Sequence, residues 1–123
     1  MAPTRYVQAW FDRLAWWQHA REFFERYDLL LSPTVACPPL RIGEFYPSEI
    51  GGVKVGREAA SVYTYPFNMT GQPAASVPCG FTKAGLPIGL QIVGRRYDDV
   101  SVLRASAAFE AAHPWAQRRP AIG

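Results

Sequence analysis

The sequence predicts an α/β fold whose elements follow the order helix, strand, long loop, helix, strand, strand, helix. Two observations lead to this prediction. A long stretch with apolar residues three and four positions apart is followed directly by three consecutive leucines, a pattern typical of a helix and then a buried strand. Farther along, a glycine-containing link joins two apolar segments, which predicts a β-hairpin. Helices that alternate with strands favour a parallel or mixed sheet.

Composition and charge limit the function classes. The chain of 123 residues fits one domain, and an apolar share of 49% with a charged share of 19% excludes an intrinsically disordered protein. The net charge of +3 is mild and the arginines are scattered, so we expect no nucleic-acid partner. No apolar run is long enough to cross a bilayer and no signal peptide is visible, so we expect no membrane partner.

The two cysteines indicate a reducing compartment. Cys37 and Cys79 lie far apart, each beside a proline, and neither belongs to a metal-ligand pattern. We therefore predict reduced, packed thiols in a cytoplasmic protein that needs no metal or cofactor. A disulfide between the two remains an open alternative at this point.

Residues 4–27 are predicted to form a helix, because apolar side chains recur along one stripe without an intervening glycine or proline. The first residues carry no clear capping pattern, so we expect the helix to begin upstream of the chain. Its aromatic content exceeds what one helix can hide, which leaves two interpretations: a core helix, or an exposed face for a partner. The stripe consists of Val7, Trp10, Phe11, Leu14, Trp17, Phe24 and Tyr27.

Residues 28–34 are predicted to form a strand buried on both faces, because Leu29, Leu30 and Leu31 are not interrupted by a polar residue. Residues 35–57 are predicted to be an irregular loop within a single partial domain, since prolines and glycines gather there. The glycines of 51–56 fail as a phosphate-binding loop, because Arg57 and Glu58 stand where lysine and a hydroxyl residue are required. A surface loop or a small hairpin is predicted there instead.

The second half of the chain reads as a helix, a hairpin and a final helix. Residues 58–70 are predicted to be helical, with Pro66 kinking or ending the helix. Strands follow over 74–81, with an irregularity or sheet edge at Pro78, and over 86–94. The last helix is predicted over 100–112, after Asp98 and Asp99, which suit its positive end. Its inner stripe is predicted to be Val100, Leu103, Ala107 and Ala111, and Pro114 ends it.

The chain offers no convincing catalytic residue. The G-x-S-x-G and S-x-x-K patterns are absent, and both lysines, Lys54 and Lys83, fall in predicted loops. His19 and His113 have no partner at metal-ligand spacing, so we interpret them as surface or capping residues. Nothing near Cys79 in the sequence would activate it as a nucleophile. From the residues alone, we predict an α/β unit without a catalytic constellation.

Four motifs stand out along the chain: YDLLLSPT at 27–34, PFNMTGQPAASVPCG at 66–80, GLPIGLQIVG at 85–94 and the closing Pro114-Trp115. In these motifs the chain resembles the C-terminal segment of the amidase signature hydrolases. The likeness covers nearly all of the chain except residues 1–3 and the middle loop, and the combined motifs are highly specific. It implies the C-terminal portion of a mixed-sheet amidase signature fold.

This resemblance implies hydrolysis of carboxamide C–N bonds by a Ser–cis-Ser–Lys triad, with an oxyanion held by backbone N–H groups. The triad of the family lies in a Gly/Ser-rich region upstream of this segment, and no position of this chain matches it. We therefore transfer no catalytic residue, and we expect the chain to be inactive alone. The implied partner of the whole enzyme is a small amide substrate.

The resemblance does carry over a substrate-pocket wall. In the family, the helix before the Pro-Phe-Asn turn faces the substrate, and residues three, four and seven apart share a helix face. This selects Glu58, Ser61, Val62 and Tyr65, for which helix packing alone is an equal alternative. The amidotransferase subunits of the family often carry aspartate where Ser61 stands, so serine favours a small-amide or aryl-amide hydrolase.

Two further interpretations remain open. The chain resembles a subunit fragment of a glutamine-dependent tRNA amidotransferase in the same motifs, and it would then dock a partner chain. It is otherwise a non-catalytic α/β module that self-associates through its aromatic helix. A partial sheet exposes strand edges, so we also predict an oligomer formed through those edges or through the aromatic helix.

Overall fold

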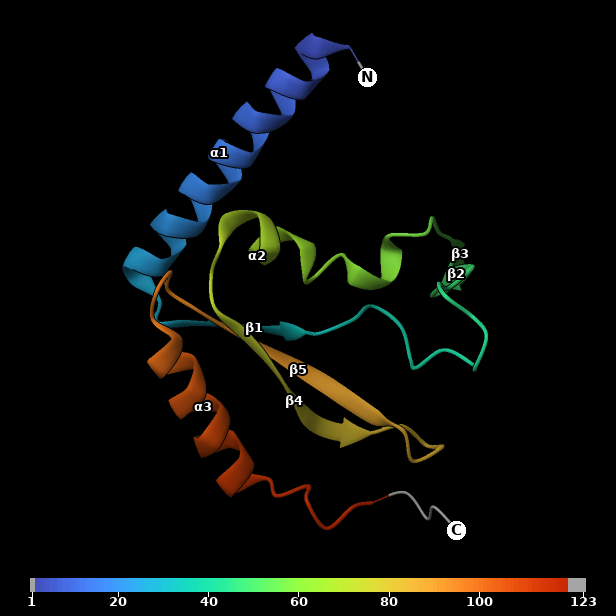
Figure 1. The fold of residues 1–123 in the computed structure, drawn as a ribbon. Coiled ribbons are helices and arrows are strands. Elements are labelled where there is room, and N and C mark those ends of the chain that lie inside the picture. The colour runs from blue at the N-terminus through green and yellow to red at the C-terminus, as the bar shows by residue number, and fades with distance from the viewer. Residues whose placement is uncertain (1, 120–123) are drawn as a thin grey trace.

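The computed structural model describes residues 2–119 and confirms the α/β class (Figure 1). The order of elements is the predicted one, with a small hairpin added in the long loop. The elements are α1 (Pro3–Arg26), β1 (Leu29–Pro33), β2 (Glu49–Ile50), β3 (Val53–Lys54), the 3₁₀ turn η1 (Ala59–Ser61), α2 (Tyr65–Thr70), β4 (Ala74–Phe81), β5 (Pro87–Gly94) and α3 (Asp99–Ala112).

Three strands form the main sheet in the order β1-β5-β4, and both pairings are antiparallel. In the centre of the sheet, Ile92 of β5 lies opposite Leu31 of β1 and Ala75 of β4. The ladder between β4 and β5 shifts register between Pro78 and Gly80. The irregularity predicted at Pro78 is thus confirmed, because proline has no N–H to give to the ladder.

The strand predicted over 28–34 is confirmed as β1, but its predicted burial on both faces is wrong. Within residues 2–119, β1 pairs with β5 alone, so it is an edge strand. Leu31 is 60% exposed, and Leu29 and Leu30 are only half-buried. A run of leucines indicates burial but cannot show which neighbour provides it.

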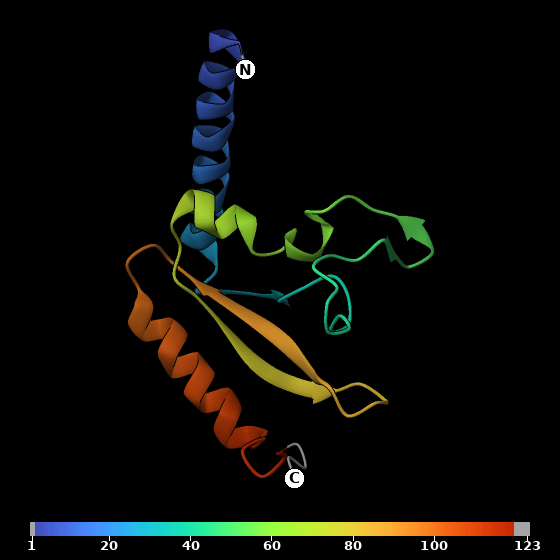
Figure 2. The same cartoon turned by 45° about the vertical axis from the view of Figure 1, so that its right-hand side comes forward.

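Two layers flank the sheet (Figure 1). Figure 2 shows that α3 runs along one face, whereas η1 and α2 lie on the other side. The core between the sheet and α3 is built from Val77, Ile92 and Val102, and Phe109 packs against it. The opposite face is polar where Ser76 and Gln91 stand, since these residues alternate with the core positions along their strands.

The inner stripe predicted for the last helix is wrong. Val100 and Leu103 are exposed, the latter to 66%, whereas Val102 is 3% exposed and faces the core. Ala105 and Phe109 complete the inward face. Both stripes have helical spacing, so periodicity alone cannot choose between them. Asp98 fixes the start of α3, as predicted, by accepting a hydrogen bond from the Ser101 N–H at 3.2 Å.

Helix α1 is confirmed, but most of it projects away from the sheet (Figures 1 and 2). Phe24, near its C-terminal end, is its one buried residue. Farther up, Trp10, Phe11, Leu14 and Trp16 are exposed, Phe11 to 61%. The core-helix interpretation therefore fails for the N-terminal part of α1 in this chain, and the exposed aromatic face is what the structure has.

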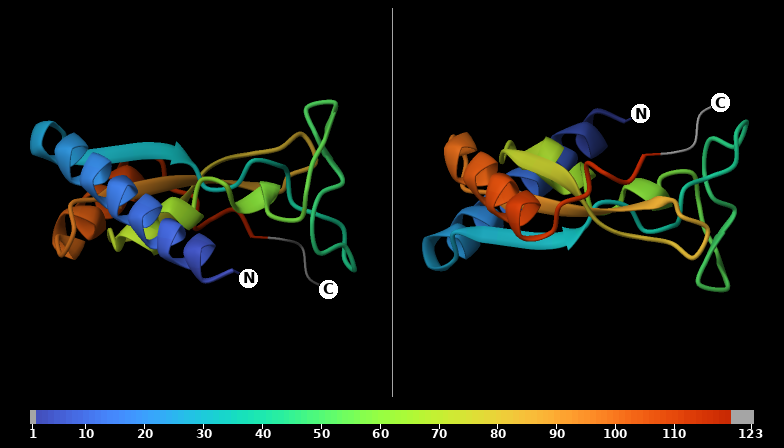
Figure 3. Two further views of the ribbon diagram at one scale, coloured as in Figure 1. Left: turned by 90° about the horizontal axis from the view of Figure 1, so that it is seen from above. Right: turned by 90° about the horizontal axis from the view of Figure 1, so that it is seen from below.

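The long loop contains the small hairpin predicted for 51–56. Strands β2 and β3 pair through Ile50 and Val53, and Gly51 and Gly52 form the turn with positive φ. Figure 3 shows this hairpin at the end of the molecule opposite the start of β1. It stands apart from the main sheet and leaves that sheet at three strands.

The helix predicted over 58–70 is broken. Residues 59–61 form a single 3₁₀ turn, and the α-helix begins only at Tyr65. Pro66 lies in the first turn of α2 and starts the helix instead of ending it. Its fixed φ suits that position, and an N–H there would have no helical partner in any case. Gly71, with φ of 78°, ends α2 as a left-handed C-cap.

The cysteines are free thiols, so the disulfide alternative does not hold in this structure. Cys37 is partly buried, but Cys79 is exposed, and the prediction of a packed thiol is wrong at that position. Cys79 follows Pro78 within the irregular stretch of β4, which carries it out of the regular alternation. In the part of the chain that the structure describes, no helix has both the length and the apolar character to span a membrane.

Candidate functional site

The predicted pocket wall is a surface segment that begins at Glu58 and ends at Tyr65. Its end residues meet: the Tyr65 hydroxyl donates a hydrogen bond to Glu58 Oε2 at 2.6 Å. The break between η1 and α2 means that these four residues do not lie on one face of a continuous helix, as the spacing predicts. The structure nevertheless brings the first and last of them into direct contact.

The Glu58 contact changes the acidity of the phenol. The hydrogen bond to the Glu58 carboxylate is the main reason that the pKa of Tyr65 lies above its ordinary value of 10.0, and a hydrogen bond with Ser61 opposes the rise. A phenol whose pKa is raised stays protonated at neutral pH. The one hydrogen of the Tyr65 phenol is donated to Glu58, and Tyr65 is unsuited to accept a proton as a general base.

The two middle residues of the wall differ in role. Ser61 is half-buried, and its carbonyl accepts hydrogen bonds from the N–H and the hydroxyl of Thr64, at 3.0 and 3.1 Å. Val62 is 48% exposed and presents an apolar surface to solvent. The four predicted residues thus form a mixed surface with one carboxylate–phenol pair, one hydroxyl and one aliphatic side chain.

Two hydrogen bonds attach this wall to the sheet region. Gln91 Nε2, from the central strand β5, donates to the Tyr63 carbonyl at 2.9 Å. The Ala36 N–H donates to the Ala60 carbonyl at 3.2 Å. Sequence reasoning missed Gln91; the one available signal was a single amide residue inside the apolar run of β5.

A hydroxyl pair lies on the same polar face of the sheet. Thr34 Oγ1 and Ser76 Oγ are 2.7 Å apart and share a hydrogen bond over Gly89. A Cβ atom at Gly89 would lie 2.7 Å from Thr34 Oγ1 and 2.8 Å from Ser76 Oγ, so only glycine fits there without a shift. Each hydroxyl is therefore occupied by the other, and neither is paired with a basic side chain.

Residues 2–119 contain no assembled nucleophile and base. Among the hydrogen bonds of this part of the chain, none joins a serine, threonine or cysteine side chain to a histidine or lysine. The exposed thiol of Cys79 donates a hydrogen bond to the Ile88 carbonyl, at 3.5 Å. His113 stacks on Phe109, with ring centroids 5.1 Å apart. Within the described range, no three His, Cys, Asp or Glu side chains are grouped as a metal site.

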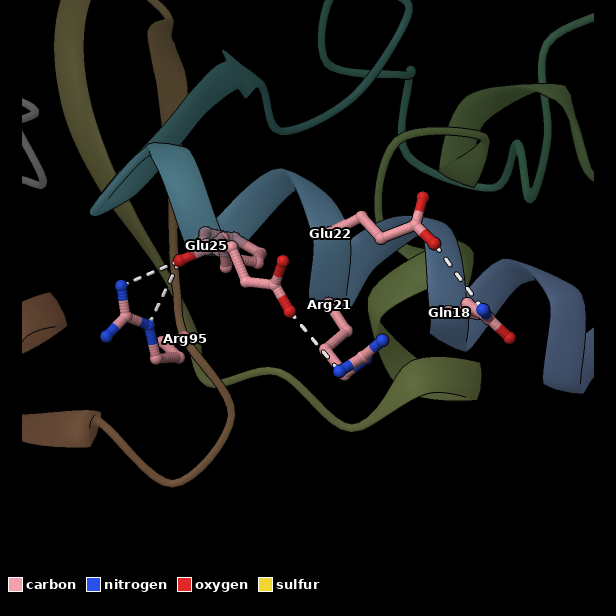
Figure 4. Close-up of polar contacts among 6 residues, drawn as sticks. Gln18, Arg21, Glu22, Glu25 and Arg95 are labelled. Atoms are coloured by element: carbon pink, nitrogen blue, oxygen red, sulfur yellow. Dashed lines mark hydrogen bonds and ion pairs between the residues drawn. The ribbon is translucent and has the colours of Figure 1, made fainter.

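The concave surface beside α1 is separate from the wall. A hollow of about 340 Å³ lies between the C-terminal half of α1 and the turn after β5, lined mainly by Trp17, Arg21, Phe24, Arg95 and Arg96. Figure 4 shows its polar contacts: Arg95 donates twice to the Phe24 carbonyl, and Arg21 pairs with Glu25. None of the four wall residues lines this hollow.

A second hollow, of about 650 Å³, lies at the β4–β5 turn. It is largely apolar, and its lining includes Phe81, Leu86, Trp115 and Arg118. The Arg118 guanidinium lies 4.7 Å from the centre of the Phe81 ring. The wall residues are absent from this lining too. Glu58, Val62 and Tyr65 are exposed, so these three residues face solvent.

The geometry supports binding and orientation more than bond breaking. The wall offers polar groups and an apolar surface on a segment held by hydrogen bonds to its backbone carbonyls, which suits one side of a pocket for a small polar molecule. A hydrolytic reaction needs a nucleophile and a base in mutual reach, and the described residues do not provide them. The reacting groups of any hydrolysis at this wall have to come from other residues.

Comparison with known proteins gives one consistent result. The protein-family model Amidase matches residues 2–103. The chain is 42% identical over 106 residues to an acylamidase of Rhodococcus erythropolis, which covers 85% of the chain and 22% of that enzyme. It is 43% identical over 95 residues to a Glutamyl-tRNA(Gln) amidotransferase subunit of Myxococcus xanthus, which covers 77% of the chain and 18% of that relative.

A solved structure agrees with these sequence matches. The crystal structure of a bacterial aryl acylamidase of the amidase signature enzymes superimposes with a TM-score of 0.79 at 41% identity. The match covers 88% of this chain and 24% of that one. The chain spans about a fifth of the length of the curated relatives it matches.

Proposed function

This chain belongs to the amidase signature family, and we propose that it is the C-terminal segment of a hydrolase that cuts carboxamide C–N bonds. The observation that carries the proposal is the family match over residues 2–103 together with a wall that has binding groups but no nucleophile–base pair. In this proposal the residues form a partial domain, and the catalytic Ser–cis-Ser–Lys groups belong to another part of the enzyme. The chain alone is then inactive.

The proposed substrate is a small amide or an aryl amide. Two of the similar proteins are an acylamidase and an aryl acylamidase, which supports this class. The wall formed by Glu58, Ser61, Val62 and Tyr65 contributes one side of the substrate pocket. Val62 supplies apolar contact to an acyl or aryl group. The Tyr65 phenol oxygen, whose one hydrogen is donated to Glu58, can accept a hydrogen bond from an amide N–H.

Membership of an amidotransferase complex is the second candidate function. It is supported by the 43% identity to the Myxococcus xanthus amidotransferase protein, whose name indicates work within a complex. Ser61 argues against it, since an uncharged hydroxyl binds the ammonium group of glutamine more weakly than a carboxylate does. Glutamine-dependent ammonia release in the presence of a partner chain would favour this candidate over the aryl-amide hydrolase.

Association through exposed surfaces is part of the proposal. The outer edges of β1 and β4 are free of strand partners within residues 2–119, and Trp10, Phe11 and Leu14 are exposed on α1. Such surfaces favour association, as they do in a free-standing self-associating module. Sizing at micromolar concentration is expected to give a species larger than a monomer, and a monodisperse monomer contradicts this part.

The hydrolase proposal is tested with two proteins. The isolated chain is incubated with an aryl acetamide such as p-nitroacetanilide, and no turnover is expected. In an acylamidase chimaera, the matching segment of the Rhodococcus erythropolis enzyme is replaced by this chain, and turnover of the same amide is expected.

Two results would overturn the proposal. The first is reproducible turnover by the isolated chain that a single substitution within it abolishes. The second is a chimaera that folds, as judged by its melting transition, but hydrolyses no amide.

A further inference from the structure

Gln91 is a polar residue in an apolar place. It lies on the central strand β5 and is 3% exposed, and the next two residues, Ile92 and Val93, are fully buried. A buried amide is costly unless its hydrogen bonds are satisfied, and an aliphatic residue would fill the same position at no such cost. The contacts of Gln91 therefore indicate what its amide does.

Both donors of the Gln91 amide have defined acceptors. Nε2 donates to Ser32 Oγ of β1 at 3.0 Å and to the Tyr63 carbonyl at 2.9 Å. An amide nitrogen carries two hydrogens, so these two bonds use its full donor capacity. One side chain thus connects the central strand, an edge strand and the segment between η1 and α2.

The Tyr63 carbonyl lies in the middle of the proposed pocket wall. It follows Ser61 and Val62 directly and precedes Tyr65 by two positions. Val62 and Tyr65 are exposed, so side-chain packing within the described residues does not hold them. The backbone here is attached through the bond from Gln91 and the bond from Ala36 to the Ala60 carbonyl.

We propose that Gln91 is a positioning residue of the amide pocket: its amide holds the Tyr63 carbonyl and so places the wall residues without touching the substrate. This inference rests on the proposed function, since it assigns a role in that same pocket. A misplaced wall weakens binding of the ground state and the transition state together. Removal of the Gln91 donors is therefore expected to act mainly on KM.

Two substitutions distinguish the two hydrogen bonds that Gln91 Nε2 donates, one to Ser32 and one to the Tyr63 carbonyl. Gln91→Met keeps the length of the side chain and its lack of charge but removes both donors. Ser32→Ala removes the other acceptor and leaves the bond to Tyr63 in place, so it is the matched control. A role in sheet stability alone predicts similar effects of the two variants, whereas a role in placing the wall predicts an effect of Gln91→Met only.

The first measurement uses the isolated chain and does not depend on activity. Amide hydrogen exchange is followed at Ser61 and Thr64, whose N–H groups donate to the Glu58 and Ser61 carbonyls. Gln91→Met is expected to speed exchange there by about fivefold or more relative to amides of the β4–β5 ladder, the size of one net hydrogen bond. Ser32→Ala is expected to leave this ratio unchanged, and an unchanged ratio in Gln91→Met overturns the inference.

The second measurement uses the acylamidase chimaera. Gln91→Met is expected to raise KM for the aryl amide by about tenfold with kcat changed by less than about twofold, and Ser32→Ala to change neither. An active chimaera whose KM is insensitive to Gln91→Met overturns the positioning role and leaves the proposed function intact. A folded chimaera that is inactive with Gln91 in place overturns the proposed function, and the exchange measurement still decides whether Gln91 places the segment.

Discussion

Tyr65 and Glu58 form a hydrogen bond of 2.6 Å across a break in the helical backbone. Residues seven apart meet readily on a continuous helix, but here a 3₁₀ turn and an irregular stretch separate them. The pair closes the segment that holds Ser61 and Val62. It therefore gives the wall a polar contact between two exposed side chains, in addition to the attachment that Gln91 provides from the sheet.

Glu58→Gln is expected to lower the pKa of Tyr65 toward its ordinary value, because the carboxylate acceptor is the main cause of the rise. With the folded-state pKa above the unfolded one, the pair stabilises the fold at neutral pH, and this stabilisation is lost as the pH rises through the folded-state pKa. The ¹³Cζ resonance of Tyr65, assigned with Tyr65→Phe, reports the titration. Glu44→Gln is the control, and a pKa equal in wild type and Glu58→Gln contradicts the assignment.

Asp98 is expected to make the stability of α3 dependent on pH. Its pKa is lowered by hydrogen bonds from Ser101, so its contribution is full at neutral pH and is lost as the pH falls through the depressed folded-state value. Asp98→Ala should lower Tm at pH 7, and Asp98→Asn, which keeps the capping oxygen, should restore most of it and remove the acid dependence. A Tm that is the same in Asp98→Ala and wild type at pH 7 would exclude the capping role.

The sequence predicts which segments form helices and strands better than it predicts which surfaces of these elements pack together. The three consecutive leucines identify β1, and Pro78 identifies an irregular ladder, because both signals are local. The burial of Leu31 and the inward face of α3 depend on which surfaces pack together, and periodicity does not specify this. A run of leucines therefore predicts that a strand forms, but it does not predict how deeply the strand is buried.

The candidate site follows the same rule. The sequence predicts that Glu58 and Tyr65 share one helix face, but in the structure they meet across a 3₁₀ turn and a separate α-helix. Pro66 lies in the first turn of α2, a position that suits its ring, so the α-helix begins there and does not run on from Glu58. The sequence alone does not distinguish a proline in a first turn from a proline that kinks a longer helix. The role of Gln91 is not predictable from the sequence, because its partner is a backbone carbonyl. Every residue has such a carbonyl, so the residue types do not show which one accepts the bond.

The inward face of α3 is tested by two neighbouring substitutions. Val102→Ala removes two methyl groups from the core and is expected to lower the free energy of unfolding by about 2 kcal/mol. Leu103→Ala removes a larger side chain that is mostly exposed, and a change within about 0.5 kcal/mol is expected. Urea unfolding measures both, and the reverse order would restore the stripe predicted from the sequence.

Arg95 is expected to hold the C-terminal end of α1 against the sheet. Its Nε and Nη2 atoms donate to the Phe24 carbonyl at 3.1 and 2.6 Å, where the helix carries partial negative charge. Arg95→Lys cannot reproduce the paired donors, so a loss of about 1 kcal/mol in the free energy of unfolding is expected. Arg21→Lys keeps its ion pair with Glu25 and serves as the control on the same helix, with almost no change expected.

Gly94 is expected to tolerate no side chain, because the end of β5 lies against α3. A Cβ atom there would be 2.6 Å from Val102 Cγ2 and 3.4 Å from the Asp98 carbonyl oxygen. Valine is branched at Cβ and fully buried here, so it cannot turn aside without moving the core. Overpacking of this kind typically costs about 1–3 kcal/mol, which Gly94→Ala should show in urea unfolding.

Gly80→Ala provides the matched control for Gly94, since a Cβ atom at Gly80 meets nothing within 4 Å. Both glycines lie in strands of the same sheet, so the difference in strand propensity between alanine and glycine applies to both. The expected result is a large loss for Gly94→Ala and little change for Gly80→Ala. Equal effects would mean that α3 does not pack on the end of β5 as closely as the contact with Val102 indicates.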